Sequence, residues 1–242
     1  MSNFTRNLVS DMFFSVKNKY KTLLCCFFLV AGNFIFSQDS LKKYSYNELS
    51  QLAFDNENNE KKKVVYLKEY YKRASKEKTT ERLAEYYRDF IFLQPENKRG
   101  VLIDSALYYA NITKDYEVIG RTYLTKGVHN HNIKNFEGAL ASYLKGYNYI
   151  SRTDNDYLKN RIKYHIGIIK NYLGNYEDAI EFFTECSLFF TSNPDKYSHQ
   201  RGFIATSRGL AWAYTKTGQF RLSETTLQNV YDFCKKNRSI SS

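Results

Sequence analysis

The sequence predicts an all-α protein built as a stack of helical hairpins. From about Tyr44 onward, apolar residues recur at three- and four-residue intervals in segments separated by short polar breaks, and this spacing is typical of amphipathic helices. The 242 residues include only two prolines, Pro95 and Pro194, and 43% are apolar, so we expect long helices around a shared core. No segment shows sustained apolar and polar alternation bounded by turn dipeptides, and we therefore expect no strands.

Residues 1–37 have the layout of a secretory signal. Lysines precede a short apolar run that leads to Ser37 and a polar segment, which is the pattern of a signal peptide. We expect cleavage after Ser37, export to the periplasm or the exterior, and a repeat domain over residues 38–242. Two alternatives remain, an uncleaved segment that anchors the chain in the membrane and a lipoprotein acylated at Cys25 or Cys26.

Two degenerate hairpins are expected first. The helical periodicity predicts one hairpin from residues 46–54 and 64–74, and a second from residues 82–92 and 105–112. Ala110 serves as a small packing residue in the second. Neither hairpin has the regular small and aromatic positions of the segments that follow.

Three well-defined hairpins follow, because the sequence repeats itself at spacings of 40 and then 44 residues. We interpret the recurring small residues as sites of close helix approach and the recurring aromatic residues as filling between hairpins. Asn and Gly between the paired helices suit the turns. The predicted repeat-packing residues are Gly127, Ala139, Tyr143, Gly167, Ala179, Phe183, Ala211 and Ser223.

This pattern resembles the tetratricopeptide repeat (TPR), whose signature couples Leu-Gly and Tyr on one helix to Ala, an aromatic residue and a second small residue on the next. The best copy consists of Ile166-Gly167, Gly174-Asn175-Tyr176, Ala179, Phe183 and Cys186. The resemblance implies a helical-hairpin solenoid of about five hairpins, three of them well defined. Because the family's usual period is 34 residues, we expect longer second helices or inserts in the linkers.

The N-terminal segment together with residues 37–50 is also similar to the start of a group of Bacteroidetes regulators. In those helix-turn-helix regulators and sensor kinases, TPR-like repeats form an extracytoplasmic region that precedes a membrane span and an output domain. The resemblance covers the sensor portion only. Two functions are favoured: a non-catalytic protein–protein interaction scaffold of the cell envelope, and the sensor portion of a signal-transduction or transcriptional regulator whose span and output domain are missing from this chain. An enzyme or carrier is the third alternative.

No catalytic motif is present. The sequence contains neither a phosphate-binding Gly-rich loop nor a nucleophile elbow nor an H-E-x-x-H pair. Residues 75–78, 153–155 and 216–218 approximate the three motifs of serine β-lactamases in order. That chemistry needs the third motif on a strand beside the nucleophile, whereas here it falls in a turn between helices. We therefore expect no enzymatic activity.

The four histidines do not form a metal-binding pattern. His129 and His131 are the only close pair, and no cysteine or second histidine pair lies at zinc spacing nearby. We expect this pair at a solvated helix end, His165 on a helix that faces the groove, and His199 in a polar linker. The sequence thus predicts no metal site and no cofactor.

The net charge of +11 belongs in part to residues 1–37. Elsewhere lysine runs such as residues 61–63 share their helices with glutamates, as on a solvated helix face. We expect no nucleic-acid partner, and membrane contact only where the N-terminal segment is uncleaved.

The family resemblance places partner binding on the side lined by the first helix of each hairpin. Positions six before, three before and one after the small packing residue share one helical face. They combine aromatic and aliphatic side chains with arginines, a mixture favoured at interface hot spots and able to hold carboxylates. We expect a protein or peptide partner, including acidic ones; the alternative is that some of these side chains pack between neighbouring first helices. The predicted groove residues are Arg121, Leu124, Val128, Arg161, Tyr164, Ile168, Ala205, Arg208 and Trp212.

The last helix is expected to leave an apolar face uncovered, because each hairpin of a repeat array buries its apolar side against the next one. The residues after Cys234 are few and polar. We expect this face to form a homo-oligomer or to pack on a partner. Its predicted residues are Leu222, Leu227, Val230, Tyr231 and Phe233.

Overall fold

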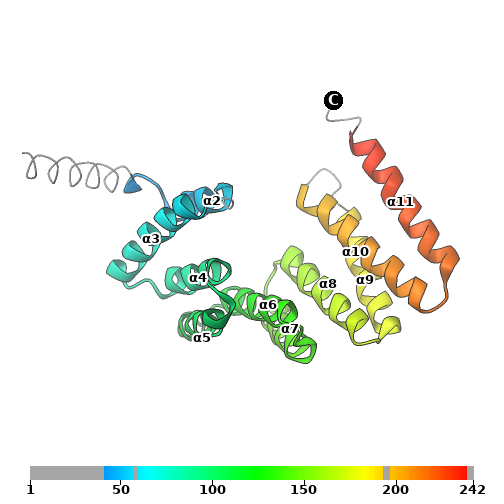
Figure 1. Ribbon diagram of the computed structural model, residues 1–242, viewed down its shortest axis with the longest axis horizontal. Helices are drawn as coiled ribbons and strands as arrows, with labels where there is room; N and C mark the ends of the chain where they lie inside the picture. The colour runs from blue at the N-terminus through cyan, green and yellow to red at the C-terminus, as the bar shows by residue number, and fades with distance from the viewer. Residues whose placement is uncertain (1–40, 57–58, 193–196, 239–242) are drawn as a thin grey trace, which may run out of the picture. The chain divides into compact units, whose positions relative to one another are not determined.

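The computed structural model describes residues 41–56, 59–192 and 197–238. The described residues form ten α-helices and one short 3-10 helix, and they contain no strand (Figure 1). The helices pair in chain order, which confirms the all-α fold and the stacked-hairpin arrangement. The predicted signal over residues 1–37 lies outside the described residues. No helix in the described ranges is long and apolar enough to cross a membrane.

The chain divides into two compact units at Glu77. In the first unit, α2 (Tyr46–Asp55) pairs with α3 (Glu60–Glu77), as the periodicity predicted. A capping box begins α2, because the Ser45 hydroxyl accepts from the N–H of Glu48 and the Glu48 carboxylate accepts from the N–H of Ser45. Arg73 on α3 donates to two backbone carbonyls that precede α2. This arginine therefore ties the start of the hairpin to its second helix.

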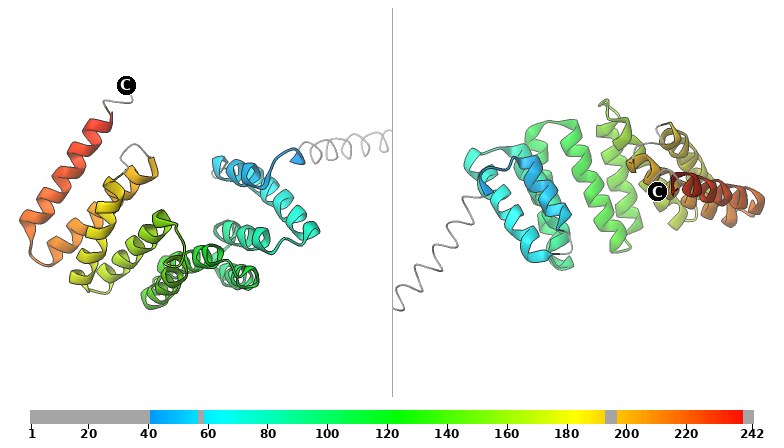
Figure 2. Two further views of the ribbon diagram at one scale, coloured as in Figure 1. Left: turned by 180° about the vertical axis from the view of Figure 1, so that it is seen from behind. Right: turned by 90° about the horizontal axis from the view of Figure 1, so that it is seen from above.

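The second unit contains four hairpins, and consecutive hairpins contact each other (Figures 1 and 2). In each pair the first helix contacts the second, and α5 contacts α6, α7 contacts α8 and α9 contacts α10. The short 3-10 helix η1 (Ile91–Leu93) follows α4 directly. The pairs are α4 (Thr80–Phe90) with α5 (Glu96–Thr113), α6 (Tyr116–Asn132) with α7 (Phe136–Ile150), α8 (Asp156–Tyr172) with α9 (Tyr176–Thr191), and α10 (Tyr197–Lys216) with α11 (Phe220–Arg238).

Helix length explains the long repeat spacing. The first helices α6 and α8 have 17 residues each, while the second helices α7 and α9 have 15 and 16. The expectation of longer second helices or linker inserts, made relative to the family's usual period of 34 residues, stays a prediction. A helix gains 1.5 Å per residue, so each of these helices presents an extended face to its neighbours.

The turns inside the last three hairpins have the same geometry. Lys134, Gly174 and Gly218 occupy the same repeat position and have φ values of 61°, 82° and 74°. In each turn the next residue donates its N–H to the carbonyl oxygen five residues earlier, at 2.8 to 2.9 Å. This is the Schellman arrangement that ends many helices. A left-handed residue at this position is natural for glycine and strained for Lys134.

Glycines on the first helices receive aromatic rings from the second helices. A Cβ atom added to Gly127 would lie 2.2 Å from the ring of Tyr143, and one added to Gly167 would lie 2.9 Å from the ring of Phe183. The Phe183 ring also faces Gly209 of the following hairpin, where an added Cβ would lie 2.5 Å away. Phe183 is thus held between two hairpins at positions that only glycine leaves open.

The other predicted repeat-packing residues lie in the interior. Ala139 and Ala179 are fully buried, and Ala211 is 3% exposed. Ser223 is buried as well, and its hydroxyl donates to the carbonyl oxygen of Ala211 across the hairpin at 2.9 Å. The hydroxyl of Ser223 therefore joins the two helices where the other hairpins have alanine.

Two histidine expectations are wrong. His129, expected at a solvated helix end, is 8% exposed, and His199, expected in a linker, lies within α10 and is 5% exposed. The Nδ1 atoms of both have no hydrogen-bond partner among the described residues. Rings from the preceding hairpin lie 5.0 to 5.9 Å from the His199 ring, and periodicity along one helix does not reveal such cover.

Candidate functional site

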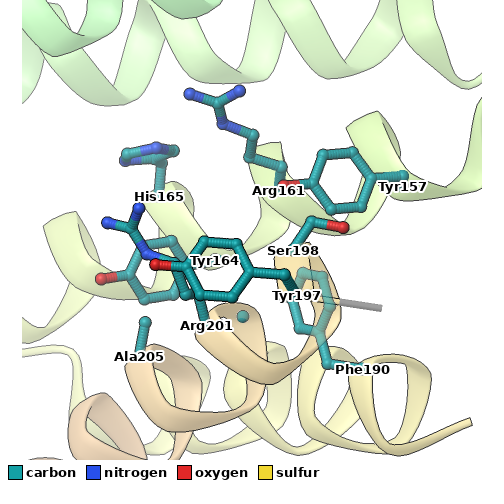
Figure 3. Close-up of a pocket in the computed structure, with 10 residues that line it drawn as sticks. Tyr157, Arg161, Tyr164, His165, Phe190, Tyr197, Ser198, Arg201 and Ala205 are labelled. Atoms are coloured by element: carbon teal, nitrogen blue, oxygen red, sulfur yellow. The ribbon is translucent and has the colours of Figure 1, made fainter. Parts of the chain in front are cut away.

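A pocket of about 470 Å³ lies between the first helices α8 and α10, and the end of α9 contributes one ring to it (Figure 3). The lining positions on α8 and on α10 are single residues or adjacent pairs about one helical turn apart, so each helix presents a single face to the pocket. The lining residues are Tyr157, Arg161, Tyr164 and His165 from α8, Phe190 from α9, and Tyr197, Ser198, Arg201, Gly202 and Ala205 from α10.

Small residues on α10 make room for the pocket. A Cβ atom added to Gly202 would lie 2.5 Å from the Phe190 ring, so α10 can approach α9 this closely only with glycine there. Ala205, one turn further along, also has a short side chain. The long side chains of Arg161 and Arg201 therefore border a space that no side chain of the described residues fills (Figure 3).

The pocket is positively charged. Arg161 and Arg201 are exposed, and none of the described residues that line the pocket is acidic. The guanidinium of Arg201 lies 5.8 Å from the centre of the Tyr197 ring, a distance at which cation and ring attract each other. Burial raises the pKa of Tyr164, and the nearby charge of Arg208 opposes part of that rise. Arg208 thus adds a third positive charge near the pocket.

His165 is a neutral member of the site. Its ring is 5.2 Å from the ring of Tyr143 in a stacked arrangement and 5.2 Å from the ring of Tyr164 edge-on. Burial lowers the pKa of His165 to about 3, and the charges of Arg161 and His131 act in the same direction. At neutral pH the imidazole therefore offers one donor and one acceptor without a charge.

The structure brings together only some of the predicted groove residues. Arg161, Tyr164 and Ala205 line the pocket. Arg208 is exposed and close enough to Tyr164 to influence its pKa. Trp212 lies outside the lining; its ring is 5.2 Å from that of Tyr172.

The remaining predicted groove residues have other roles. Leu124 is 6% exposed and belongs to the core around α7 and α8, so it cannot face a partner. Val128 packs against the same core, and Ile168 packs against the cluster that contains Phe183. Arg121 forms an ion pair with Glu117 at 2.5 Å. In each first helix, the residue three positions before the small packing residue lies between the core face and the groove face. An aliphatic side chain at this position turns toward the core.

One turn of the groove face was not predicted from the sequence. Tyr157 and Arg201 both lie ten residues before the small packing residue of their hairpin, on the same face as the predicted positions. Extending the face by one turn toward the N-terminus of each first helix would have found both. Phe190 carries no such signal, because it reaches the pocket from the second helix α9.

Comparisons with known proteins add no assignment. No protein-family model matches the chain, and no curated protein matches its sequence. The chemistry of the pocket is therefore defined by its own lining, which combines two exposed arginines, three tyrosines and a neutral imidazole.

Proposed function

We propose that this chain is a non-catalytic, TPR-like interaction scaffold whose pocket between α8 and α10 binds an acidic segment of a partner protein. The observation that carries the proposal is the pair Arg161 and Arg201, which lie on facing helices around a pocket whose described lining residues include no acidic side chain. The repeated Gly and aromatic positions at spacings of 40 and 44 residues support the TPR-like interpretation.

The chemistry of the pocket suits a carboxylate flanked by apolar atoms. Each guanidinium presents a planar set of N–H donors that can bind both oxygens of a carboxylate. The rings of Tyr157, Tyr164 and Tyr197 offer apolar faces with hydroxyl groups at their ends, as is common at interface hot spots. A volume of about 470 Å³ lies within the range of small-ligand pockets and accommodates one or two side chains of a peptide.

The same lining argues against catalysis. Ser198 and His165 both line the pocket, and the described residues include no hydrogen bond between them. An imidazole with a pKa of about 3 is a poor general base at neutral pH, because an effective base has a pKa near the working pH. Binding is therefore the role that this lining supports.

We place this scaffold in the cell envelope because residues 1–37 have the layout of a secretory signal. Sequencing the N-terminus of the exported protein tests this part of the proposal. The expected first residue is Gln38; a chain that still begins at Met1 or Met12 would contradict cleavage.

The binding proposal is tested by selecting peptides from a random displayed library on the full chain. We expect enrichment of Asp or Glu next to aromatic or aliphatic residues. A selected peptide is then titrated against wild-type chain, Arg161→Gln, Arg201→Gln and the double variant. Arg221→Gln serves as the matched control, because Arg221 is an exposed arginine on α11 outside the pocket.

Loss of both pocket arginines should weaken binding at least tenfold, since charge-assisted hydrogen bonds are among the stronger polar contacts. Binding to the wild-type chain should also weaken with added salt, because exposed charges are screened over about 10 Å at 0.1 M. The Arg221→Gln control should bind like the wild type. Selected peptides without acidic residues, or equal binding by the double variant, would show that this pocket is not the site.

A further inference from the structure

A second pocket, of about 540 Å³, shares Tyr157 with the first. Three carboxylates line it, from Glu117 at the start of α6 and from Asp154 and Asp156 at the start of α8, and the described part of the lining includes no lysine or arginine. Phe189 of α9 and His199 of α10 also contribute. We call this the acidic pocket, and the pocket that contains Arg161 and Arg201 the basic pocket.

The carboxylates that line the acidic pocket outnumber the cations that form ion pairs with them among the described residues. Glu117 pairs with Arg121 at 2.5 Å, and Asp156 pairs with Lys159 at 2.9 Å. Asp154 has no ion pair with any described residue. Burial by itself would raise the pKa of Glu117, but hydrogen bonds to Asn155 and Arg121, with the charge of Arg121, hold that pKa below its ordinary value. The Glu117 carboxylate therefore stays ionised at neutral pH.

His199 provides an independent sign that a ligand belongs in the acidic pocket. Its side chain is 5% exposed and lines the pocket, and its Nδ1 atom has no hydrogen-bond partner within the described ranges. Buried polar atoms without a partner are rare in folded proteins. The Nδ1 atom is covered in this conformation, so a donor in the pocket reaches it once the ring turns, with the neutral imidazole protonated on Nε2.

An aromatic cluster joins the two pockets. The ring of His199 lies 5.9 Å from Tyr157, 5.7 Å from Phe190 and 5.0 Å from Phe189. Tyr157 and Phe190 line the basic pocket, while Tyr157, Phe189 and His199 line the acidic pocket. One short segment can therefore reach both pockets across this cluster.

We propose that the acidic pocket binds an arginine side chain of the same partner segment whose acidic side chain occupies the basic pocket. The location of the segment rests on the proposed function. A guanidinium supplies N–H donors for Asp154 and, once the His199 ring turns, for its Nδ1 atom, and it attracts the faces of Tyr157 and Phe189. Within the described residues no three of the potential ligands converge closely enough to hold a metal ion, which favours an organic cation.

The first test uses a small probe, Nα-acetyl-arginine amide, which carries the guanidinium without a carboxylate. The chain contains four histidines, so ¹⁵N-histidine labelling of the full chain gives few imidazole signals. We expect saturable shifts of the His199 signals and little change at His165. Nα-acetyl-norleucine amide, a neutral probe of similar length, should leave His199 unchanged. Equal effects of both probes, or no shift of His199 at 20 mM arginine probe, would overturn the proposal.

Asp154→Asn removes the carboxylate that has no ion pair, and Asp104→Asn removes an exposed carboxylate on α5 outside the pocket. We expect Asp154→Asn to weaken binding of the arginine probe at least fivefold and Asp104→Asn to leave it unchanged. Circular dichroism of the two variants checks that both keep their helices. Equal binding by the two variants would overturn the assignment of the guanidinium to Asp154.

The second test separates this inference from the proposed function. An acidic peptide that binds the basic pocket is resynthesised with an arginine at successive positions on either side of its acidic residue. One placement should raise the affinity at least fivefold, and the gain should disappear in Asp154→Asn but persist in Asp104→Asn.

If the acidic peptide binds and no arginine placement improves it, the proposed function stands and this inference falls. If the arginine probe shifts His199 but acidic peptides do not bind the chain, the proposed function falls, and the two-pocket segment falls with it.

Discussion

α9 and α11 are the second helices of consecutive hairpins, and Phe183 and Leu227 occupy the same repeat position in them, 44 residues apart. Phe183 is fully buried, whereas Leu227 is 48% exposed. The difference comes from the next helix: Gly209 of α10 faces the Phe183 ring, and no helix follows α11 among the described residues. Burial at this position is therefore decided by the neighbouring hairpin and not by the helix that carries the residue.

The face of α11 divides into two parts. Val230 and Phe233, expected on the uncovered side, pack against the cluster of α10, and the rings of Phe233 and Phe203 are 4.8 Å apart. Leu222, Leu227 and Tyr231 are 46% to 62% exposed. Self-association or partner binding through these exposed side chains stays a prediction.

The largest expected effect compares the two positions directly. Phe183→Ala should lower the free energy of unfolding by about 4 kcal/mol, because it removes a fully buried ring between two hairpins. Leu227→Ala should cost less than about 1 kcal/mol, because half of its side chain is already in water. Urea unfolding of both variants measures the difference. Similar losses would contradict the comparison, and a Leu227→Ala loss that grows with protein concentration would reveal a second copy on this face.

A second experiment asks whether glycine is what lets a ring sit between hairpins. Gly127→Ala should cost about 2 kcal/mol, because the added Cβ would overlap the Tyr143 ring and force it to move. Gly100→Ala is the matched control: no atom lies within 4 Å of the added Cβ on α5, and alanine favours the helix by about 1 kcal/mol. A lower unfolding temperature for Gly127→Ala together with a higher one for Gly100→Ala would support the packing argument. Changes in the same direction would contradict it.

The third prediction concerns how the free energy of unfolding depends on pH. His165 on α8 occupies the repeat position that Gly209 occupies on α10. Its pKa of about 3 in the folded chain lies below the ordinary value, so the unfolded chain binds the proton more readily. The contribution of His165 to stability is complete above about pH 7 and falls as the pH drops below about 6.5. Between pH 7 and pH 5 we expect a loss of about 1 to 2 kcal/mol.

His165→Phe is the control for this pH dependence. The variant should lose less stability over the same interval. Some slope should remain, because burial also lowers the pKa of His129 and of His131. Identical slopes in the wild type and the variant would show that His165 does not set the loss.

The smallest effect concerns the turns that keep the hairpins in register. Lys134→Gly should raise the free energy of unfolding by about 1 kcal/mol, because glycine adopts the left-handed conformation of this turn without strain. Lys126→Gly, inside α6, should lower it by about 1 kcal/mol, the usual cost of glycine in a helix. A destabilising Lys134→Gly would mean that the lysine side chain stabilises the turn by more than its strain costs.

Local patterns in the sequence were enough to predict the helices and their pairing. The turn at Gly174 and the small and aromatic positions at Gly167 and Phe183 follow from a repeat that appears when the sequence is aligned with itself. Even the degenerate hairpins were placed correctly, because a helix with one apolar face keeps its periodicity when its other residues vary. These features depend on residues a few positions apart, which a single sequence shows directly.

The site was decided by tertiary structure. Leu124 and Tyr164 stand at the same offset from their small residues, yet the first is in the core and the second lines the basic pocket. His199 seemed to belong to a polar linker and is instead covered by the rings of α8 and α9. The two pockets combine side chains from helices about 40 residues apart in the chain. Their charge and shape depend on how closely those helices pack, which the periodicity of any one helix does not contain.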